Sequence, residues 1–107
     1  MKNSKICGRF APTPSGRIHL GNIFCSLLAW LHAKSQGGEI VLRIEDLDKM
    51  RCPRPNADLL AKDLEWLGLT WDKGAYVSED SERYFQSQRF DIYAEHFRKL
   101  EEQGLIY

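Results

Sequence analysis

The sequence predicts an α/β domain built on a parallel sheet. Two short apolar runs, residues 6–11 and 39–45, have the composition of strands, and a longer segment with helical periodicity connects them. A strand, a helical crossover and a second strand place the two strands parallel in one sheet. Because the 107 residues contain only these two clear strands, and a parallel sheet normally has more, we expect the front part of a larger domain.

The composition is that of an ordinary globular protein, with 43% hydrophobic and 28% charged residues. No apolar stretch approaches the ~20 residues that span a bilayer, and the first residues lack a signal-peptide pattern. The sequence therefore predicts a cytoplasmic protein without a membrane partner. Its formal net charge of zero gives no global argument for nucleic-acid binding. Residues 1–38 nevertheless contain five Lys or Arg and no acid, which suits an anionic ligand, although chance also produces such a distribution.

Three cysteines, Cys7, Cys25 and Cys52, are odd in number and form no CxxC pair. Neither a disulfide framework nor a zinc knuckle is expected within this piece, and no metal site is predicted. We expect buried or half-buried free thiols.

The first strand, residues 6–11, ends at Pro12 and Pro14, because proline cannot continue a sheet ladder. The helix that follows carries apolar residues at helical spacing and ends at the glycine pair 37–38. Its predicted buried face consists of Ile23, Leu27, Trp30 and Leu31. The next strand, residues 39–45, is almost continuously apolar, which predicts that both of its faces are covered.

Two further helices are predicted in the second half of the chain. Asn56 is expected to cap the first of them, which buries Leu60, Leu64 and Leu67 and ends at Gly68. Residues 70–86 have no clear periodicity and predict a loop.

Trp71 is expected to pack under that loop, with Asp72 turning it. The last helix places Phe90, Tyr93, Phe97 and Leu100 on one side and ends at Gly104. We expect Trp30, Trp66 and Phe97 in the core.

Residues 10–22, FAPTPSGRIHLGN, form a stiff, glycine-spaced turn between the first strand and the first helix. In open parallel sheets ligands bind beyond the carboxyl ends of strands, where a helix begins. The free N–H groups of a helix N-terminus favour phosphates, and Gly16 and Gly21 allow a close approach of ligand and backbone. The stretch matches neither the GxxxxGK[ST] nor the GxGxxG phosphate-binding motif.

Three ordered motifs carry a resemblance to a known family. RFAPTPSG (9–16) followed by HLGN (19–22) resembles the "HIGH" signature of class I aminoacyl-tRNA synthetases, in the form used by their glutamate-activating branch. LRIEDLD (42–48) and FQSQR (85–89) are similar to two further motifs of that branch. The resemblance covers nearly the whole chain and implies the front part of a Rossmann-like, HUP-type nucleotide-binding domain over residues 1–107.

The resemblance implies the activation of glutamate by ATP with Mg²⁺, followed by transfer to tRNA. The glutamate carboxylate attacks the α-phosphorus of ATP, giving glutamyl-adenylate and pyrophosphate. Because this nucleophile is already ionised, catalysis needs positioning and charge stabilisation rather than a general base. His19, Gly21 and Asn22 would face the ATP phosphates as the catalytic signature.

The same resemblance assigns a glutamate pocket. Arg9 would bind the side-chain carboxylate, for which a guanidinium fork is well matched, and Glu45 would bind the α-ammonium group. Ala11 and Thr13 would line the pocket. Relatives commonly have Ser where this chain has Thr13, and the hydroxyl is kept.

Two groups within the branch stay open. A glutamyl-tRNA synthetase charges tRNA and carries an added anticodon-binding domain, whereas a glutamyl-Q tRNA(Asp) synthetase is shorter and transfers glutamate to queuosine. APTPSGRIHLGN and Gln88 favour the second, while the length of residues 73–85 speaks against it. Another HxGH-type nucleotidyltransferase is a third alternative, against which Arg9 and the RIED segment argue.

The chain departs from the family pattern in lacking the "KMSKS" lysine loop, since DKMRC (48–52) occurs too early and lacks the Lys-Ser pattern. The later glutamate-binding residues and the cysteine-rich zinc insert of many relatives are also missing. We therefore expect an N-terminal fragment without full activity, or an inactive nucleotide-binding remnant, and a monomer for the complete protein. Asp46 and Asp48 lack the remainder of a metal loop and are expected to cap, or to pair with Arg51 or Arg54.

Overall fold

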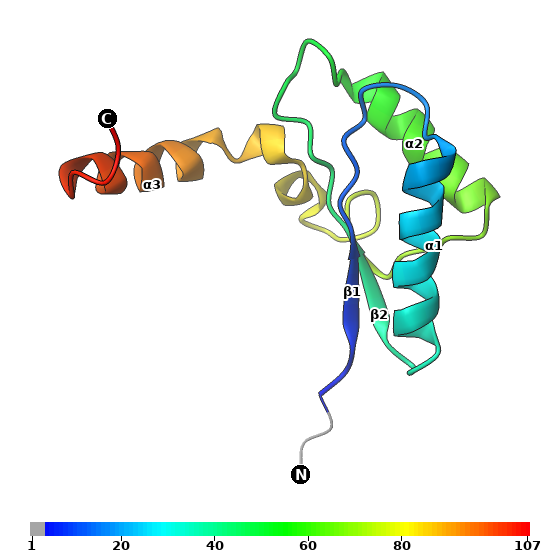
Figure 1. Cartoon of the computed structure of the whole chain (residues 1–107). Coiled ribbons are helices and arrows are strands. Elements are labelled where there is room, and N and C mark those ends of the chain that lie inside the picture. Colours follow the sequence, from blue (N-terminus) through cyan, green and yellow to red (C-terminus); the bar gives the residue numbers. More distant parts are fainter. Residues whose placement is uncertain (1–3) are drawn as a thin grey trace.

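The computed structural model describes residues 4–107. Three parallel strands in the order β1-β2-β3 form its sheet, namely β1 at Cys7–Phe10, β2 at Glu39–Leu42 and β3 at Lys73–Gly74. The helices are α1 at Leu20–Lys34, α2 at Arg54–Trp66 and α3 at Phe90–Glu102, with two 3-10 turns, η1 at Ser81–Tyr84 and η2 at Gln86–Gln88. The predicted α/β class and the helical crossover between parallel strands are confirmed (Figure 1).

Helix α1 packs on the sheet through small residues rather than through its leucines. Ala33 is fully buried, and Ala29 and Trp30 pack against the core. Gly8 allows this close packing, because a Cβ there would lie 2.9 Å from Cδ1 of Ile40. The predicted face is therefore wrong in part: Leu27 is exposed, and Leu31 is 48% exposed.

Strand β2 is covered on one face only. Helices α1 and α2 lie on the same side of the sheet (Figure 1), and Ile40 and Leu42 are fully buried beneath them. Glu39 and Val41 alternate with them and are only half-buried. The prediction that both faces are covered is wrong for the described chain, because all the crossover helices run over one face.

Helix α2 begins three residues earlier than a cap at Asn56 predicts. Its N-cap is Pro53, and Pro55 lies in its first turn, where the missing N–H has no helical partner in any case. Asn56 is therefore inside the helix and does not cap it. The predicted end is confirmed, since Gly68 follows the last turn with a φ of +79°.

The predicted loop 70–86 contains the two-residue strand β3, which the sequence did not indicate. Trp71 and Asp72 anchor it as expected: Trp71 is buried and donates from Nε1 to the Ala75 carbonyl at 2.8 Å. Asp72 accepts from the Ile40 N–H at 2.8 Å. A strand this short has no alternating pattern that sequence reasoning could detect.

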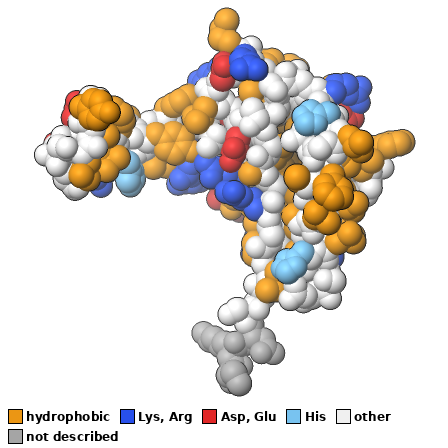
Figure 2. Space-filling view, viewed as in Figure 1, with side chains coloured by type: hydrophobic (Ala, Val, Ile, Leu, Met, Phe, Trp, Pro, Cys, Tyr) orange, Lys and Arg blue, Asp and Glu red, His pale blue; other side chains and the backbone are white. Residues whose placement is uncertain are grey.

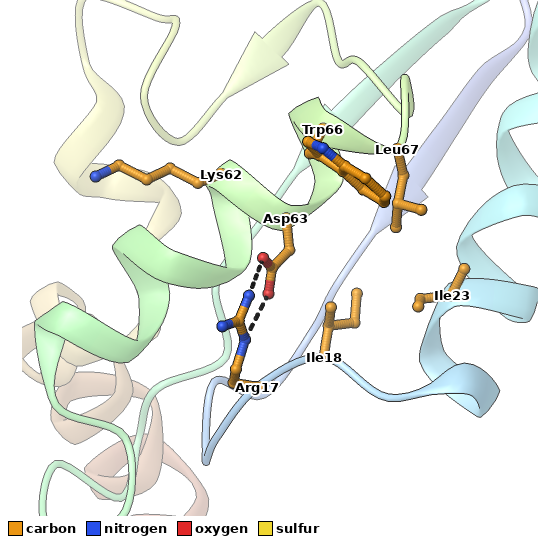
Figure 3. A pocket seen from close by; sticks show the side chains of 7 residues that line it. All are labelled: Arg17, Ile18, Ile23, Lys62, Asp63, Trp66 and Leu67. Atoms are coloured by element: carbon orange, nitrogen blue, oxygen red, sulfur yellow. Dashed lines mark hydrogen bonds and ion pairs between the residues drawn. The ribbon is translucent and has the colours of Figure 1, made fainter.

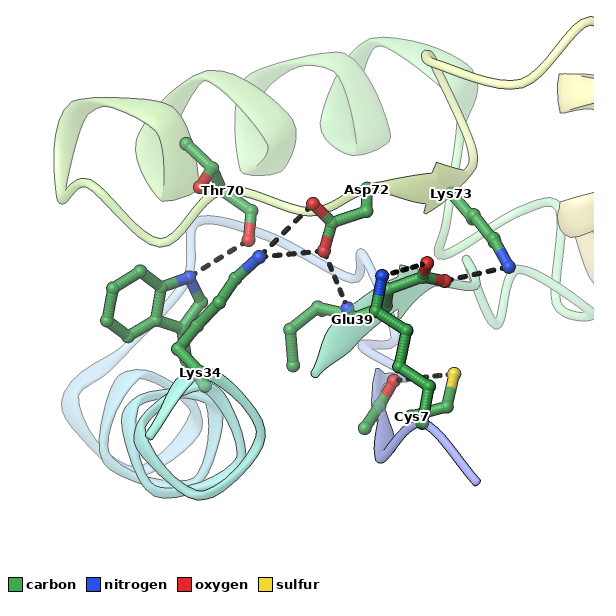
Figure 4. Close-up of polar contacts among 10 residues, drawn as sticks. Cys7, Lys34, Glu39, Thr70, Asp72 and Lys73 are labelled. Atoms are coloured by element: carbon green, nitrogen blue, oxygen red, sulfur yellow. Dashed lines mark hydrogen bonds and ion pairs between the residues drawn. The ribbon is translucent and has the colours of Figure 1, made fainter. Parts of the chain in front are cut away.

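Ion pairs join the elements at the amino end of the sheet (Figure 4). Glu39 binds the ammonium groups of Lys5 and Lys73, and Asp72 binds that of Lys34. These cations lower the pKa of Glu39 and of Asp72. This cluster fastens strands and helix α1 at the edge opposite the loop 10–22.

Helix α3 runs away from the sheet (Figure 1), and none of its residues is fully buried. Phe97 is 59% exposed and Trp66, at the end of α2, is 85% exposed. The prediction that both belong to the core is wrong for the described chain, while Trp30 does pack against it. Figure 2 shows hydrophobic side chains gathered on α3 and over α1.

The free thiols follow the prediction only for Cys52, which is buried, whereas Cys7 and Cys25 are exposed. Within residues 4–107, no helix is both long enough and apolar enough to cross a membrane.

Candidate functional site

The turn after β1 is fastened to the chain that follows β2. The Arg43 N–H donates to the Phe10 carbonyl at 2.8 Å, and the Glu45 N–H donates to the Pro12 carbonyl at 2.9 Å. Pro14 is fully buried, which holds the middle of the turn against the core. The backbones of Arg9 and Glu45 therefore reach the same carboxyl edge of the sheet, where ligands of parallel sheets bind.

A cavity of about 140 Å³ lies between this turn and α1. It brings together three of the residues that the sequence assigns to the site, Arg9, Ala11 and Asn22. The rest of its lining consists of Phe10, Pro12, Cys25 and Ser26. Two of the four predicted glutamate-site residues, Arg9 and Ala11, and one predicted ATP ligand, Asn22, thus line one small hollow.

The amino end of α1 has the properties of an anion-binding terminus. Its N-cap is His19, in extended conformation, with no side chain hydrogen-bonded to the cap and no acid in the first turn. The ring of His19 lies over Gly21, since a Cβ at Gly21 would be 3.5 Å from its Cε1. The first backbone N–H groups of the helix therefore keep a positive end that suits a phosphate.

The other predicted site residues lie around this cavity without lining it. Thr13 and His19 are exposed, Glu45 is half-buried, and Gly21 is in the first turn of α1. The structure thus brings Arg9, Ala11 and Asn22 together in one cavity, whereas the other predicted site residues lie on neighbouring parts of the same segments.

The two glycines of the turn are not demanded by the fold. A Cβ at Gly16 would meet no atom within 4 Å, and one at Gly21 would make only ordinary contact with the His19 ring. Neither has a positive φ. The open space beside them is therefore free for a ligand.

The acidic residues after Glu45 have structural roles, as expected, but Asp46 has a different partner. Asp46 is buried and accepts hydrogen bonds from the Ser87 N–H at 2.9 Å and the Ser87 hydroxyl at 2.7 Å. Asp48 accepts from the Arg51 N–H at 3.2 Å. The predicted pairing of Asp46 with an arginine is wrong, because residues 85–89, which include Ser87, fold back onto residues 43–46.

Cys52 lies beside these carboxylates. Burial, together with the negative charges of Asp48 and Asp46, raises the pKa of its thiol. The buried thiol is therefore held neutral and acts as a small apolar side chain.

Sequence reasoning missed a larger cavity of about 540 Å³ between the turn and α2 (Figure 3). Arg17 and Asp63 both line it and pair through two contacts, at 2.6 Å and 3.3 Å. The apolar lining includes Ile18, Ile23 and the exposed Trp66. Trp66 was the residue that could have indicated this cavity, but the sequence predicted it in the core.

The comparisons with known proteins agree with this geometry. A family model described as tRNA synthetases class I (E and Q), catalytic domain, matches residues 5–107. The chain is 48% identical over 102 residues to a glutamyl-Q tRNA(Asp) synthetase of Symbiobacterium thermophilum, a match that covers 95% of this chain and 32% of that protein. It is 44% identical over 104 residues to a glutamate–tRNA ligase of Akkermansia muciniphila, covering 97% of this chain and 24% of that protein.

Solved structures give the same result. The crystal structure of a glutamate tRNA ligase from Elizabethkingia meningosepticum, in complex with its amino acid, matches with a TM-score of 0.74 and 34% identity. That match covers 92% of this chain and 20% of the other. The chain therefore spans 32% or less of the length of these relatives.

Both the ordered motifs and the Rossmann-like arrangement of strands and helices are thereby confirmed as those of aminoacyl-tRNA ligases. The chain belongs to the class I tRNA synthetase (E and Q) catalytic-domain family, of which it holds an amino-terminal part.

Proposed function

We propose that this chain is the amino-terminal part of a synthetase that activates glutamate with ATP at the carboxyl edge of β1 and β2. The observation that carries the proposal is the cavity that Arg9, Ala11 and Asn22 line together. Residues proposed for glutamate and a residue proposed for ATP thus meet at one place, as a reaction between these two substrates requires.

Glutamate lies with its side-chain carboxylate on the guanidinium of Arg9, an exposed group on β1. Glu45, fastened through its backbone to Pro12, neutralises the α-ammonium group. Ala11 and Thr13 form the wall of this pocket. The α-carboxylate then points toward α1, where ATP is bound.

The ATP phosphates lie on the amino end of α1, next to His19, Gly21 and Asn22. The missing cap and the absence of an acid in the first turn leave the helix end positive. Within residues 4–107, no three His, Cys, Asp or Glu side chains gather into a metal site. In this proposal Mg²⁺ enters the site bound to the phosphates of ATP.

In the reaction, a carboxylate oxygen of glutamate forms a bond to the α-phosphorus of ATP. The bond from that phosphorus to the bridging oxygen breaks, and pyrophosphate leaves with the electron pair. The products are glutamyl-adenylate and pyrophosphate, and no proton has to be moved. The chain contributes orientation of the two substrates and positive charge around the phosphates.

The acceptor in the second step is a tRNA. We favour queuosine of tRNA(Asp), on the grounds of Gln88 in the QSQR motif and of the 48% identity to a glutamyl-Q tRNA(Asp) synthetase. The 44% identity to a glutamate–tRNA ligase supports the alternative, an ordinary glutamyl-tRNA synthetase. Transfer of labelled glutamate to tRNA(Asp) with and without queuosine, and to tRNA(Glu), distinguishes the two.

Activation is tested in a chimera, because the chain spans only part of its relatives. Residues 5–107 replace the matching segment of the Akkermansia muciniphila ligase, and glutamate-dependent exchange of pyrophosphate into ATP is measured. We expect exchange, and a loss of about 30-fold or more in kcat/KM for glutamate with Arg9→Ala, as removal of one partner of a charged pair costs about 2–5 kcal/mol. Arg98→Ala, an exposed arginine on α3, is the matched control.

Exchange that survives Arg9→Ala unchanged would contradict the glutamate assignment. A folded chimera with no exchange at all would favour the inactive remnant.

A further inference from the structure

Three arginines and two tyrosines line a third cavity, of about 390 Å³, between the end of β2, the turn η1 and the start of α3. Its lining consists of Arg43, Arg83, Arg89, Tyr84, Tyr93 and one acid, Asp80. The proposed ATP and glutamate ligands line a different cavity, so the proposed function assigns no role to this one.

The arginines of this cavity lack carboxylate partners among residues 4–107. Arg43 donates to the hydroxyl of Tyr93 at 3.3 Å, and Arg89 donates to the backbone carbonyl of Arg83 at 3.5 Å. Both acceptors are neutral. Three cations facing one hollow repel one another, and an anion there would offset that repulsion.

Other arginines of the chain do have such partners. Arg17 pairs with Asp63, and Arg54 pairs with Glu82. Arg9 and Arg51 also lack a carboxylate partner among the described residues, but they lie apart, whereas this cavity brings three such arginines together.

Backbone hydrogen bonds fix the walls of the cavity. The Ile44 N–H donates to the Tyr84 carbonyl at 2.8 Å, and the Gln86 N–H donates to the Ile44 carbonyl at 3.0 Å. The Arg83 N–H donates to the Asp80 carbonyl at 2.9 Å. The segment that carries Arg83 and Tyr84 is thus held against the end of β2 without a ligand, which lowers the entropy cost of binding.

The cavity opens on the face of the sheet that α1 and α2 leave uncovered. Arg9 pairs with Val41 in the parallel register, and side chains two residues apart on a strand share a face, so Arg43 follows Val41 on the same side as Arg9. Leu42 and Ile44, on the opposite face, are fully buried. The arginine cavity therefore opens on the same face of the sheet as the side chain of Arg9, the proposed ligand of the glutamate carboxylate.

We propose that this cavity binds one nucleotide of an RNA strand. Its phosphate lies between the guanidinium groups of Arg83 and Arg89, whose forks match phosphate oxygens, and its base packs on Tyr84 or Tyr93. The volume of about 390 Å³ is in the range of small-ligand pockets and exceeds what a lone phosphate fills. The identity of the RNA as the tRNA acceptor rests on the proposed function.

The test measures binding of a short fluorescent single-stranded RNA to the 107-residue chain by anisotropy, at several salt concentrations and without ATP or glutamate. Arg83→Gln/Arg89→Gln is compared with Arg98→Gln/Lys99→Gln, which removes the same charge from exposed positions of α3. We expect the first pair to weaken binding by about tenfold or more and to reduce the salt slope by about one to two. The second pair should change affinity by less than about threefold, because only distant phosphates sense it.

Equal losses of RNA affinity in both double variants would show that only the overall positive charge matters, and would overturn the proposal. The absence of RNA binding by the unaltered chain would overturn it as well. The far-ultraviolet circular dichroism and the urea midpoint of each variant show that it is folded. A third variant, Tyr93→Ala, should weaken binding by about fivefold or more even at high salt, since stacking is not screened. An unchanged affinity would overturn the stacking contact.

Failure here is distinguishable from failure of the proposed function. If the chimera exchanges pyrophosphate but the chain does not bind RNA, only the proposed RNA site is overturned. Conversely, specific loss of RNA binding in Arg83→Gln/Arg89→Gln without any exchange would leave the RNA site standing and remove glutamate activation.

Discussion

Gly21 is a glycine that the backbone conformation and the packing do not require, although the sequence assigns it to the ATP site. Its φ is ordinary, and a Cβ there would make only van der Waals contact with the ring of His19. Gly74 shows the opposite case, because its φ is +102° and a Cβ would collide with the backbone of Leu42. The fold explains Gly74, whereas the packing of the described residues does not require a glycine at position 21.

We therefore expect Gly21→Ala to leave the free energy of unfolding unchanged or to raise it by up to about 1 kcal/mol, since alanine is the better helix former. ATP binding should weaken by about tenfold or more, because the added methyl group lies where the phosphates approach the backbone. Urea unfolding measures the first effect, and calorimetric titration of the Gly21→Ala chimera with ATP measures the second. The matched control is Gly74→Ala, which should unfold the chain more easily.

If Gly21→Ala left ATP affinity unchanged, the amino end of α1 would not be the phosphate site.

At the scale of the elements, α1 shows why periodicity predicted the helix and yet assigned its face wrongly. Apolar residues occupy most of its circumference, so Leu27 and Leu31 fit a buried stripe as well as Ala29 and Ala33 do. What decides between the two stripes is Gly8, on a neighbouring strand, which allows only small side chains to pack closely. Sequence spacing within the helix carries no information on that neighbour.

The packed and exposed faces of α1 can be told apart by substitution. Ala33→Leu should lower the free energy of unfolding by about 1–3 kcal/mol, because Ala33 is fully buried and the site has no room for a larger side chain. Leu31→Gln, at a residue that is 48% exposed, should change it by less than about 0.5 kcal/mol. Urea midpoints of the two variants provide the measurement.

A larger loss in Leu31→Gln than in Ala33→Leu would mean that the predicted leucine face is the packed one.

For the whole molecule, the sequence predicted the order of the first two strands and the helices, and the turn 10–22 between β1 and α1, because these follow from local patterns. It did not predict β3, whose two residues have no pattern of their own, or the exposure of Trp66 and Phe97. The sequence predicted these two aromatic residues in the core because apolar residues at helical spacing normally pack against another element. In the site, the first motif names Arg9, Ala11 and Asn22, which line one cavity, while their roles stay predictions. The Asp46–Ser87 contact and the arginine cavity depend on chain segments far apart in the sequence.

Acid should destabilise the whole fold through the ion pairs that join its elements. Lys5 and Lys73 lower the pKa of Glu39 from 4.5, Lys34 and the Ile40 N–H lower that of Asp72 from 3.8, and Arg54 lowers that of Glu82 from 4.5. In acid the unfolded chain therefore binds more protons than the folded one. Stability from these groups is fully present above about pH 4.5 and is lost as the pH falls through the lowered values.

We expect the urea midpoint to be flat from pH 7 to about pH 5 and to fall steeply below about pH 4.5. Asp72→Asn should lower the midpoint at pH 7 and make its fall in acid shallower, because the charge that Lys34 stabilises is gone while an amide oxygen can still accept from the Ile40 N–H. Glu101→Gln is the control, since Glu101 forms no ion pair within the described residues and its loss should leave the profile unchanged. An Asp72→Asn profile parallel to that of the unaltered chain would show that the Lys34–Asp72 pair, which joins α1 to the segment before β3, contributes nothing to the acid sensitivity. That sensitivity would then have to come from Glu39 and Glu82.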